Sequence, residues 1–183
     1  MNRAEYREAA VTEKDRVHTY VVWLLRDAEE ASDVTQEALL RLWQCRDAVR
    51  REAARAWLLK AAHRIALDRI RVARRRSEIP LDALVSLPDD GRLDPQRLTD
   101  DREMRLRVAE AMTELAPRDR AVMVLRELVG MNLTEIGDVL GCTLAATKVA
   151  LHRARKRLRK LLTKDIEREP GPSGDAVGIA RAS

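Results

Sequence analysis

The chain of 183 residues has no phenylalanine and is poor in glycine and proline. Its aromatic residues are two Tyr and three Trp, and it contains only seven Gly and six Pro. Alanine, leucine and arginine are abundant instead. Because glycine and proline interrupt helices while these three residues favour them, we expect an almost entirely helical protein of one compact domain or two small ones.

Long apolar runs and a cysteine framework are also missing. No run approaches the length that crosses a bilayer, and the charged first segment, residues 1–16, does not have the pattern of a secretory signal. Cys45 and Cys142 are too few for a disulfide framework, and neither has a second Cys or a His at metal-ligand spacing. We therefore expect a cytoplasmic protein without membrane insertion, whose two thiols are either inert or sensitive to oxidants.

Signatures of catalysis are absent as well. The three histidines, His18, His63 and His152, have no nucleophile motif, phosphate-binding loop or metal cluster around them. We therefore expect neither an enzyme nor a bound cofactor or metal. His152 lies in a basic run, where a DNA contact or a surface position fits better than catalysis.

Residues 112–162 have the pattern of a DNA-binding helix-turn-helix that continues into a basic helix. Leu133, Ile136 and Leu140 recur at helical spacing, and Gly141 follows them as a turn residue. A threonine two residues later is placed to cap a second helix. The spacing therefore predicts a short helix, a glycine turn and a long second helix.

The second helix of this unit separates apolar from cationic residues. One face carries residues at steps of three and four, namely Thr147, Leu151, Ala154, Leu158 and Leu161. Between residues 148 and 164 there are eight Lys or Arg and no acid. This is the charge pattern of a surface that follows DNA phosphates, and the alternative is a solvated charged face.

The first part of the chain predicts a small helical bundle. Three stretches of helical periodicity follow one another between residues 13 and 76, and Ser32 or Asp33 is expected to cap the second. The third stretch, residues 53–76, becomes strongly basic, with seven Lys or Arg against one acid between residues 60 and 76. Helices with a common apolar side and short connections pack as a bundle.

Residues 77–101, between the two helical blocks, differ in composition. They include three prolines, one glycine and seven acids against two arginines, and prolines at these positions prevent a long helix. We interpret them as a flexible acidic linker. The tail, residues 166–183, is rich in Pro, Gly and Ser and is expected to be disordered. The predicted fold class is all-α, with small helical domains over residues 1–76 and 102–165.

Two helical modules joined by an acidic linker resemble the bacterial RNA polymerase sigma factors of the extracytoplasmic-function (ECF) group, the shortest class, which keeps only conserved regions 2 and 4. The resemblance rests on motifs whose order and spacing together are specific: DVTQEALLRLW (33–43), RAWLLKAA (55–62), ALDRIR (66–71), LAPRDRAVMVLR (115–126) and LHRARKRL (151–158). It implies a non-catalytic subunit that binds core RNA polymerase and directs promoter recognition, DNA melting and transcription initiation.

The resemblance implies that residues 33–43 dock on the clamp helices of the largest polymerase subunit, while the second module contacts the flap. The contact residues carried over are Asp33, Gln36, Glu37, Leu40 and Arg41. Leu40 lies away from the apolar stripe of its helix, so we expect it to be exposed. It is either part of this interface or an ordinary surface leucine.

The third helix and the loop before it would meet the melted minus-ten element. Strand opening needs a platform for an extruded base and cations along the displaced backbone. Trp57 is either this platform or a core residue. The cationic candidates are Arg50, Arg51, Lys60, Arg64, Arg69, Arg71, Arg74, Arg75 and Arg76. Many relatives have an asparagine at the position of Arg64.

The second helix of the helix-turn-helix would enter the major groove at the minus-thirty-five element. The candidate contacts are Thr143, Ala146, Lys148, Val149, Ala150, His152, Arg153, Arg155 and Arg157. Relatives usually have a serine and an arginine where this chain has Val149 and Ala150, and we expect both to lie away from the core. They either pack on thymine methyl groups, or the domain reads its site through DNA shape and phosphates.

The resemblance also implies an anti-sigma factor that hides both DNA surfaces and could keep the protein near the membrane. The acidic linker is then either a spacer or a segment that threads the polymerase channel. Two other functions remain open. A helix-turn-helix repressor or activator predicts dimers and palindromic sites but leaves the first module unexplained. A sigma-like interaction protein without promoter reading is favoured by Val149 and Ala150 and disfavoured by the basic run.

Overall fold

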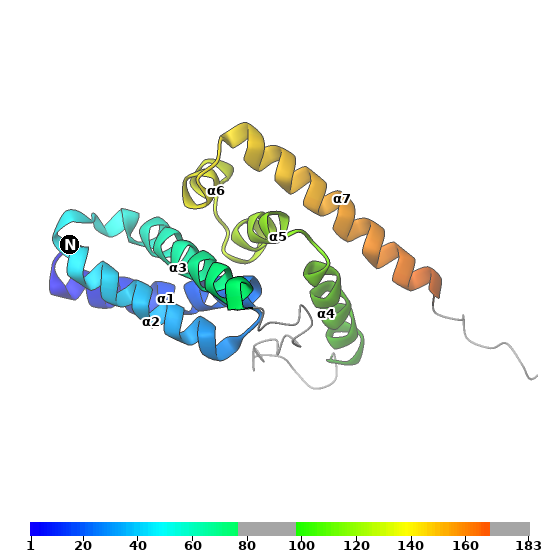
Figure 1. Cartoon of the computed structure of the whole chain (residues 1–183), viewed down its shortest axis with the longest axis horizontal. Helices are drawn as coiled ribbons and strands as arrows, with labels where there is room; N and C mark the ends of the chain where they lie inside the picture. The colour runs from blue at the N-terminus through cyan, green and yellow to red at the C-terminus, as the bar shows by residue number, and fades with distance from the viewer. Residues whose placement is uncertain (77–97, 169–183) are drawn as a thin grey trace, which may run out of the picture.

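A computed structural model describes residues 1–76 and 98–168, and all regular elements in these ranges are helices (Figure 1). The N-terminal module contains α1 (Arg3–Leu25), α2 (Ala28–Cys45), the 3-10 turns η1 (Arg46–Ala48) and η2 (Arg51–Ala53), and α3 (Ala54–Arg76). The C-terminal module contains α4 (Leu98–Thr113), α5 (Pro117–Met123), the short π-helix η4 (Val124–Leu128), α6 (Leu133–Leu140) and α7 (Leu144–Arg168). The prediction of an all-α fold is confirmed.

Two predicted segments fall mostly outside the described residues. Of the acidic linker, residues 77–97 are not described, and α4 already begins at Leu98, inside the predicted linker. Of the tail, residues 169–183 are not described, and α7 continues to Arg168. Among the helices that are described, none is both long and apolar enough to span a lipid bilayer.

The start of α2 lies earlier than the sequence predicted. Arg26 adopts a left-handed conformation, with φ of 62°, and ends α1. The carboxylate of Asp27 then accepts a hydrogen bond from the Glu30 amide at 2.9 Å and caps α2. The expectation that Ser32 or Asp33 caps this helix was wrong, because both residues lie inside it.

The N-terminal module is a three-helix bundle. Helix α1 also begins earlier than predicted, at Arg3. Buried side chains from each helix meet in the centre, among them Val17 and Tyr20 of α1, Leu42 of α2 and Leu58 of α3, none of which is more than 1% exposed. Burying such side chains is worth about 1.5–3 kcal/mol each, which is the main force that holds the three helices together.

The two modules pack directly against each other. Helix α1 contacts α5 and η4, and α3 contacts α6, so the buried apolar residues of both modules form one continuous core (Figure 1). At this junction the Arg55 guanidinium donates a hydrogen bond to the carbonyl of Val129 and lies 3.8 Å from the Glu13 carboxylate. The junction therefore combines apolar burial with an anchoring arginine.

Candidate nucleic-acid interface

Local side-chain and backbone interactions form the helix-turn-helix between α6 and α7. Asn132 and Glu135 make a capping box at the start of α6, with bonds of 3.0 and 2.8 Å. Gly141 ends this helix in the left-handed region, with φ of 65°. Thr143 accepts a hydrogen bond from the Ala146 amide at 3.2 Å and caps α7. The predicted turn and cap are confirmed.

A second glycine sets the close approach of α6 to the turn, although the sequence prediction did not single it out. A Cβ atom on Gly137 would lie 2.7 Å from the carbonyl oxygen of Cys142, a contact that real structures essentially never show. The Cys142 amide donates to the Gly137 carbonyl at 2.9 Å, which fixes this approach. Thr147 of α7 is fully buried beside it, with its hydroxyl 3.3 Å from the Cys142 sulfur.

The inner face of α7 is wider than predicted. Thr147, Leu151, Ala154 and Leu161 are buried as expected. Ala150 is also buried, with 2% of its surface exposed, so the expectation that it lies away from the core was wrong. The reason is helical geometry: residue 150 is three positions from residue 147 and four from residue 154, which places it on the same side of the helix.

The outer face of α7 is apolar near its start and cationic further along. Ala145, Val149, His152 and Lys156 follow one another at steps of four, three and four and are all exposed. Val149 exposes 61% of its surface, and Leu144, in the first turn but on a neighbouring side of the helix, exposes 41%. The predicted DNA contacts did not include the exposed residues Leu144 and Ala145. Counting along the helix from the buried stripe would have placed Ala145 on the outer face.

Three predicted DNA contacts on α7 have acidic partners within the protein. Arg153 donates two hydrogen bonds to the carboxylate of Asp119 of α5, at 2.6 and 2.5 Å, and Asp119 is 4% exposed. The hydrogen bonds and negative charge of Asp119 raise the pKa of the Arg153 guanidinium. Two further pairs are exposed, Arg155 with Glu127 at 2.6 Å and Arg157 with Glu114 at 3.6 Å.

By contrast, Lys148 and Lys156 are exposed and form no salt bridge with any residue that the structure describes. Lys148 lies beside the apolar start of the outer face, and Lys156 lies on the same face two turns later. Because their charges are uncompensated inside the protein, they are available to phosphates, as are the exposed Arg159 and Lys160 further along α7.

Another arginine of the C-terminal module has a structural role that the sequence did not reveal. Arg120 is 7% exposed and donates to the carbonyls of Met112, Thr113 and Leu115 at the end of α4. Burial, together with the charge of Arg26 from the N-terminal module, lowers the pKa of Arg120. This arginine therefore fixes the end of α4 to α5.

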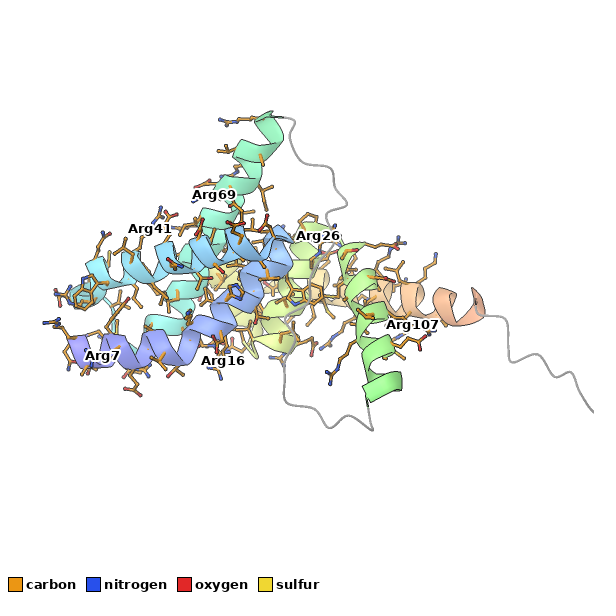
Figure 2. The ribbon with its side chains drawn as sticks, turned by 90° about the horizontal axis from the view of Figure 1, so that it is seen from below. Arg7, Arg16, Arg26, Arg41, Arg69 and Arg107 are labelled. Carbon is orange, nitrogen blue, oxygen red and sulfur yellow. The ribbon has the colours of Figure 1, made fainter. Side chains whose placement is uncertain are left out.

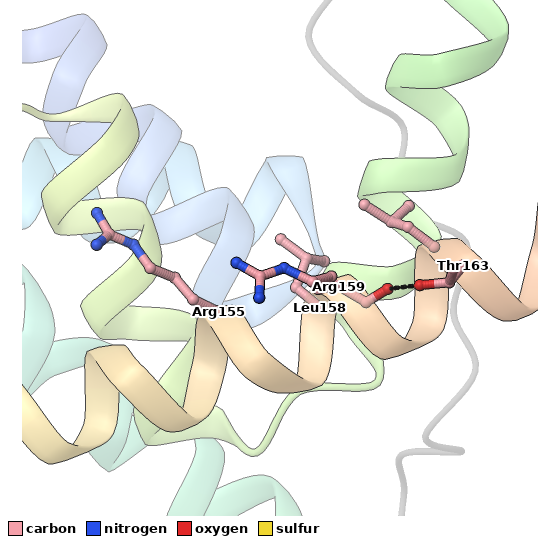
Figure 3. A pocket seen from close by; sticks show the side chains of 5 residues that line it. Arg155, Leu158, Arg159 and Thr163 are labelled. Carbon is pink, nitrogen blue, oxygen red and sulfur yellow. Dashed lines mark hydrogen bonds between the residues drawn. The ribbon is translucent and has the colours of Figure 1, made fainter.

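A shallow groove follows α7 beyond the helix-turn-helix (Figure 3). Its volume is about 450 Å³, and it is lined by Arg155, Leu158, Arg159, Leu162 and Thr163. The Thr163 hydroxyl donates to the Arg159 carbonyl at 2.5 Å, within the same helix. The groove thus places leucines and arginines side by side.

The predicted minus-ten residues differ in exposure and in pairing. Arg50, Arg64 and Arg75 are exposed, but Arg51 pairs with Glu8 at 3.1 Å. Trp57 and Lys60 are half-buried, and Trp57 packs against the core, as one of its two interpretations expected. The side chains of Arg74 and Arg76 lie outside the described residues.

Two further arginines of α3 already pair with acids of the same module. Arg69 lies between Glu30 and Glu37 of α2, at 3.5 and 3.6 Å. Arg71 pairs with Asp68 at 2.9 Å. The structure therefore brings a predicted DNA contact, Arg69, to a predicted polymerase contact, Glu37.

The predicted polymerase contacts lie on one face of α2. Asp33, Gln36 and Arg41 are exposed, and Glu37 is half-buried. Glu37 and Arg41 form an ion pair of 2.6 Å. Leu40 exposes 55% of its surface, so its predicted exposure is confirmed. Figure 2 shows Arg41 and Arg69 on the same side of the N-terminal bundle.

A buried polar pair, which the sequence prediction also missed, connects α3 to α1. The Tyr20 hydroxyl is 2.7 Å from Nδ1 of His63. Burial, and then the charge of Arg64, lowers the pKa of His63 to about 4, and burial raises the pKa of Tyr20. The neutral histidine therefore couples α3 to α1 at neutral pH.

Comparison with known proteins assigns both modules. The family model of sigma-70 region 2 matches residues 11–76, and that of sigma-70 region 4 matches residues 105–158. The chain is 33% identical over 152 residues to the ECF RNA polymerase sigma factor SigL of Mycobacterium tuberculosis, covering 79% of this chain and 84% of SigL. It therefore belongs to the ECF family of RNA polymerase sigma factors.

Other relatives differ in length. SigW of Bacillus subtilis is 29% identical over 161 residues, covering 81% of this chain and 84% of SigW. SigE of Mycolicibacterium smegmatis is 30% identical over 156 residues, covering 82% of this chain. The chain spans 58% of SigE and 45% of the SigG protein of M. tuberculosis, about half the length of these two relatives.

Solved structures share the fold. The sigma factor RpoE from Bartonella quintana, in a complex with the anti-sigma factor NepR, matches with a TM-score of 0.71 and 20% identity, over 87% of this chain and 98% of that chain. CnrH, in a complex with the cytosolic domain of CnrY, matches with a TM-score of 0.64 and 22% identity, over 90% and 91%. At these identities the likeness concerns the fold alone.

Proposed function

We propose that this chain is an alternative sigma factor that binds core RNA polymerase and directs promoter recognition, DNA melting and transcription initiation. The observation that carries the proposal is the order of a region 2 module and a region 4 module in a chain that covers 84% of SigL and of SigW. As a sigma factor it would be a non-catalytic specificity subunit that acts where the polymerase and the promoter are, in the bacterial cytoplasm.

The exposed face of α2 supports binding to the polymerase. An exposed leucine surrounded by charged and polar side chains is typical of an interface with an apolar centre and a polar rim. Leu40 occupies the centre, with Gln36 and Arg41 beside it. The partners we propose for this face and for the second module are the clamp helices and the flap of the polymerase.

The cationic face of α7 supports binding to the minus-thirty-five element. A helix-turn-helix reads base edges with the first turns of its second helix and uses cations to hold the phosphates. Here the outer face of the first turns of α7 is exposed, with Lys148 at its side and Lys156 two turns further along. The minus-ten element would meet α3 and the loop before it, where Arg50 and Arg64 are exposed.

An anti-sigma factor is the proposed regulatory partner. RpoE and CnrH, which share this fold, were solved in complexes with NepR and with the cytosolic domain of CnrY. A partner of this kind would cover the exposed faces of α2 and α7, and one that is anchored in the membrane would hold the protein there.

Run-off transcription from a genomic fragment library tests the function. Core RNA polymerase is assayed with and without the full chain, and we expect transcripts that start only when the chain is present. Stable binding to core without new transcripts would contradict promoter recognition and favour a sigma-like interaction protein. Palindromic binding sites and no effect on core polymerase would instead favour a helix-turn-helix regulator.

Matched variants connect the test to the structure. Leu40→Asp places a charge at the centre of the α2 face and should lower affinity for core polymerase at least tenfold, since a single anchor of an interface is worth about 2 kcal/mol or more. Val11→Asp is the control, because Val11 is 75% exposed on α1, outside this face. Equal affinities of the two variants would contradict the assignment of the α2 face.

A further inference from the structure

The first turns of α7 offer DNA few hydrogen-bonding side chains. Between residues 143 and 151, the Thr143 hydroxyl caps the helix by accepting from the Ala146 amide. Thr147 is fully buried, and its hydroxyl donates to the Thr143 carbonyl at 3.1 Å. Within these nine positions Lys148 is therefore the one exposed long polar side chain.

The same turns expose apolar side chains that the fold does not use. Val149 exposes 61% of its surface and Leu144 exposes 41%, whereas the inner face of α7 is buried. Valine is also a weaker helix former than alanine or lysine, so its presence here does not stabilise the helix. These side chains therefore leave an exposed apolar surface on the first turns of α7.

The cations around this surface match the charge of DNA. Lys148 adjoins Val149 in the sequence, and Lys156 lies on the same outer face two turns later. The side chain at position 145, one turn before Val149, is only a methyl group, so it leaves room for a close approach of the helix to base edges. The major groove presents one apolar group to such a surface, the C5-methyl group of thymine.

We propose that α7 reads thymine methyl groups, with Val149 as the central contact and Ala145 one turn before it. Lys148 and Lys156 hold the flanking phosphates, and the buried Ala150 takes no part. This inference rests on the proposed function, because it names how the same helix-turn-helix discriminates its site. It predicts a minus-thirty-five element whose specificity depends on thymine methyls more than on hydrogen bonds to guanine.

Replacing thymine by deoxyuridine tests the contact at the level of one methyl group. Duplexes are first selected from a randomised library with the full chain, alone and bound to core RNA polymerase. Each thymine of the selected element is then changed to deoxyuridine, which lacks only the C5-methyl group. We expect affinity to fall about fourfold for each contacted methyl, the value of one buried methyl-sized group.

Protein variants assign the effect to α7. Val149→Ala should weaken binding to the thymine duplex by a similar factor, and it should remove the further loss caused by deoxyuridine at the position it contacts. Val11→Ala, which changes an exposed valine on α1, should leave both affinities unchanged. Sensitivity to deoxyuridine that persists unaltered in Val149→Ala would overturn the assignment to this residue.

The outcomes separate the two proposals. A selected element in which every thymine tolerates deoxyuridine would overturn the reading of methyl groups while leaving promoter recognition intact. A library that shows no enrichment with either form of the protein would overturn the proposed function and this inference with it. Enrichment together with loss on deoxyuridine supports both.

Discussion

Helices α3 and α7 are both long and strongly basic, but they differ in which of their cations are paired with acids. Helix α3 has 23 residues and α7 has 25. On α3, Arg69 lies between two glutamates of α2, and Arg71 pairs with Asp68. On α7, Arg153, Arg155 and Arg157 pair with acids of other helices, whereas Lys148 and Lys156 have no salt bridge with a described residue. Charge counted along a sequence therefore overstates the charge that reaches DNA.

The two helices also differ in what covers them. Helix α3 packs into the N-terminal bundle and in addition contacts α6 of the other module. Helix α7 packs on α4, α5 and α6 and leaves its outer face exposed. In this arrangement of the modules, the outer face of α7 is open while part of α3 is engaged at the junction. The difference arises from packing, not from composition.

The largest expected effect on stability comes from Gly137→Ala, which disturbs the turn between α6 and α7. The new Cβ would lie 2.7 Å from the Cys142 carbonyl oxygen, so the backbone must shift. We expect a loss of about 3 kcal/mol in the free energy of unfolding, as for an overpacked core. Hydrogen exchange of residues 137–147 should rise, while exchange in α1 to α3 changes less.

Gly141→Ala is the control for this turn. Gly141 has φ of 65°, but nothing lies within 4 Å of an added Cβ. Its cost should be the left-handed strain alone, about 1 kcal/mol. A Gly141→Ala protein that is less stable than Gly137→Ala would show that the close approach of α6 to the turn is not decisive.

The second largest expected effect is a loss of stability at low pH, caused by His63 on the buried side of α3. The pKa of His63 is lowered from 6.5 to about 4, so between these values the unfolded chain binds a proton that the folded protein excludes. Stability is therefore lost as the pH falls through this window, by about 2 kcal/mol between pH 7 and pH 5. Urea unfolding at the two pH values measures this loss.

The variant His63→Gln, which cannot take up this proton, tests whether His63 causes the pH dependence. It should be less stable at pH 7 but should lose less stability between pH 7 and pH 5 than the unchanged protein. The same pH dependence in both proteins would show that other groups cause it.

The third effect compares an ion pair of α7 with one of α3. Asp119→Asn removes a nearly buried carboxylate that accepts two hydrogen bonds from Arg153, and we expect it to cost about 1–2 kcal/mol. Asp68→Asn breaks an exposed pair with Arg71 and should cost less than about 0.5 kcal/mol. Equal costs in urea unfolding would contradict the difference in burial that separates the two pairs.

The smallest effect tests which cations reach DNA. Lys156→Ala should lower the slope of log affinity against log salt by about 1 in promoter binding by the polymerase complex, as for one lost phosphate contact. Arg69→Ala should lower it less, because its guanidinium already lies between Glu30 and Glu37. Equal changes in slope would show that these ion pairs open when DNA binds.

Sequence reasoning succeeded where the signal was local. The helical spacing of residues 133–140, the glycine turn and the cap at Thr143 predicted the helix-turn-helix, and the structure confirms them. It failed at Ala150, because alanine is compatible with either face and only the width of the buried stripe decides. It also failed at the start of α2, where the left-handed Arg26 places the cap earlier.

The sequence by itself determined the helical class, the order of the two modules and the basic character of their last helices, because helix propensity, spacing and charge are properties of neighbouring residues. Tertiary structure decided which charges are already paired, as in Asp119 with Arg153, and which side chains remain exposed, as in Val149. It also decided that the modules pack together through Arg55. These outcomes depend on residues far apart in the chain, whose distances are set only when the helices pack.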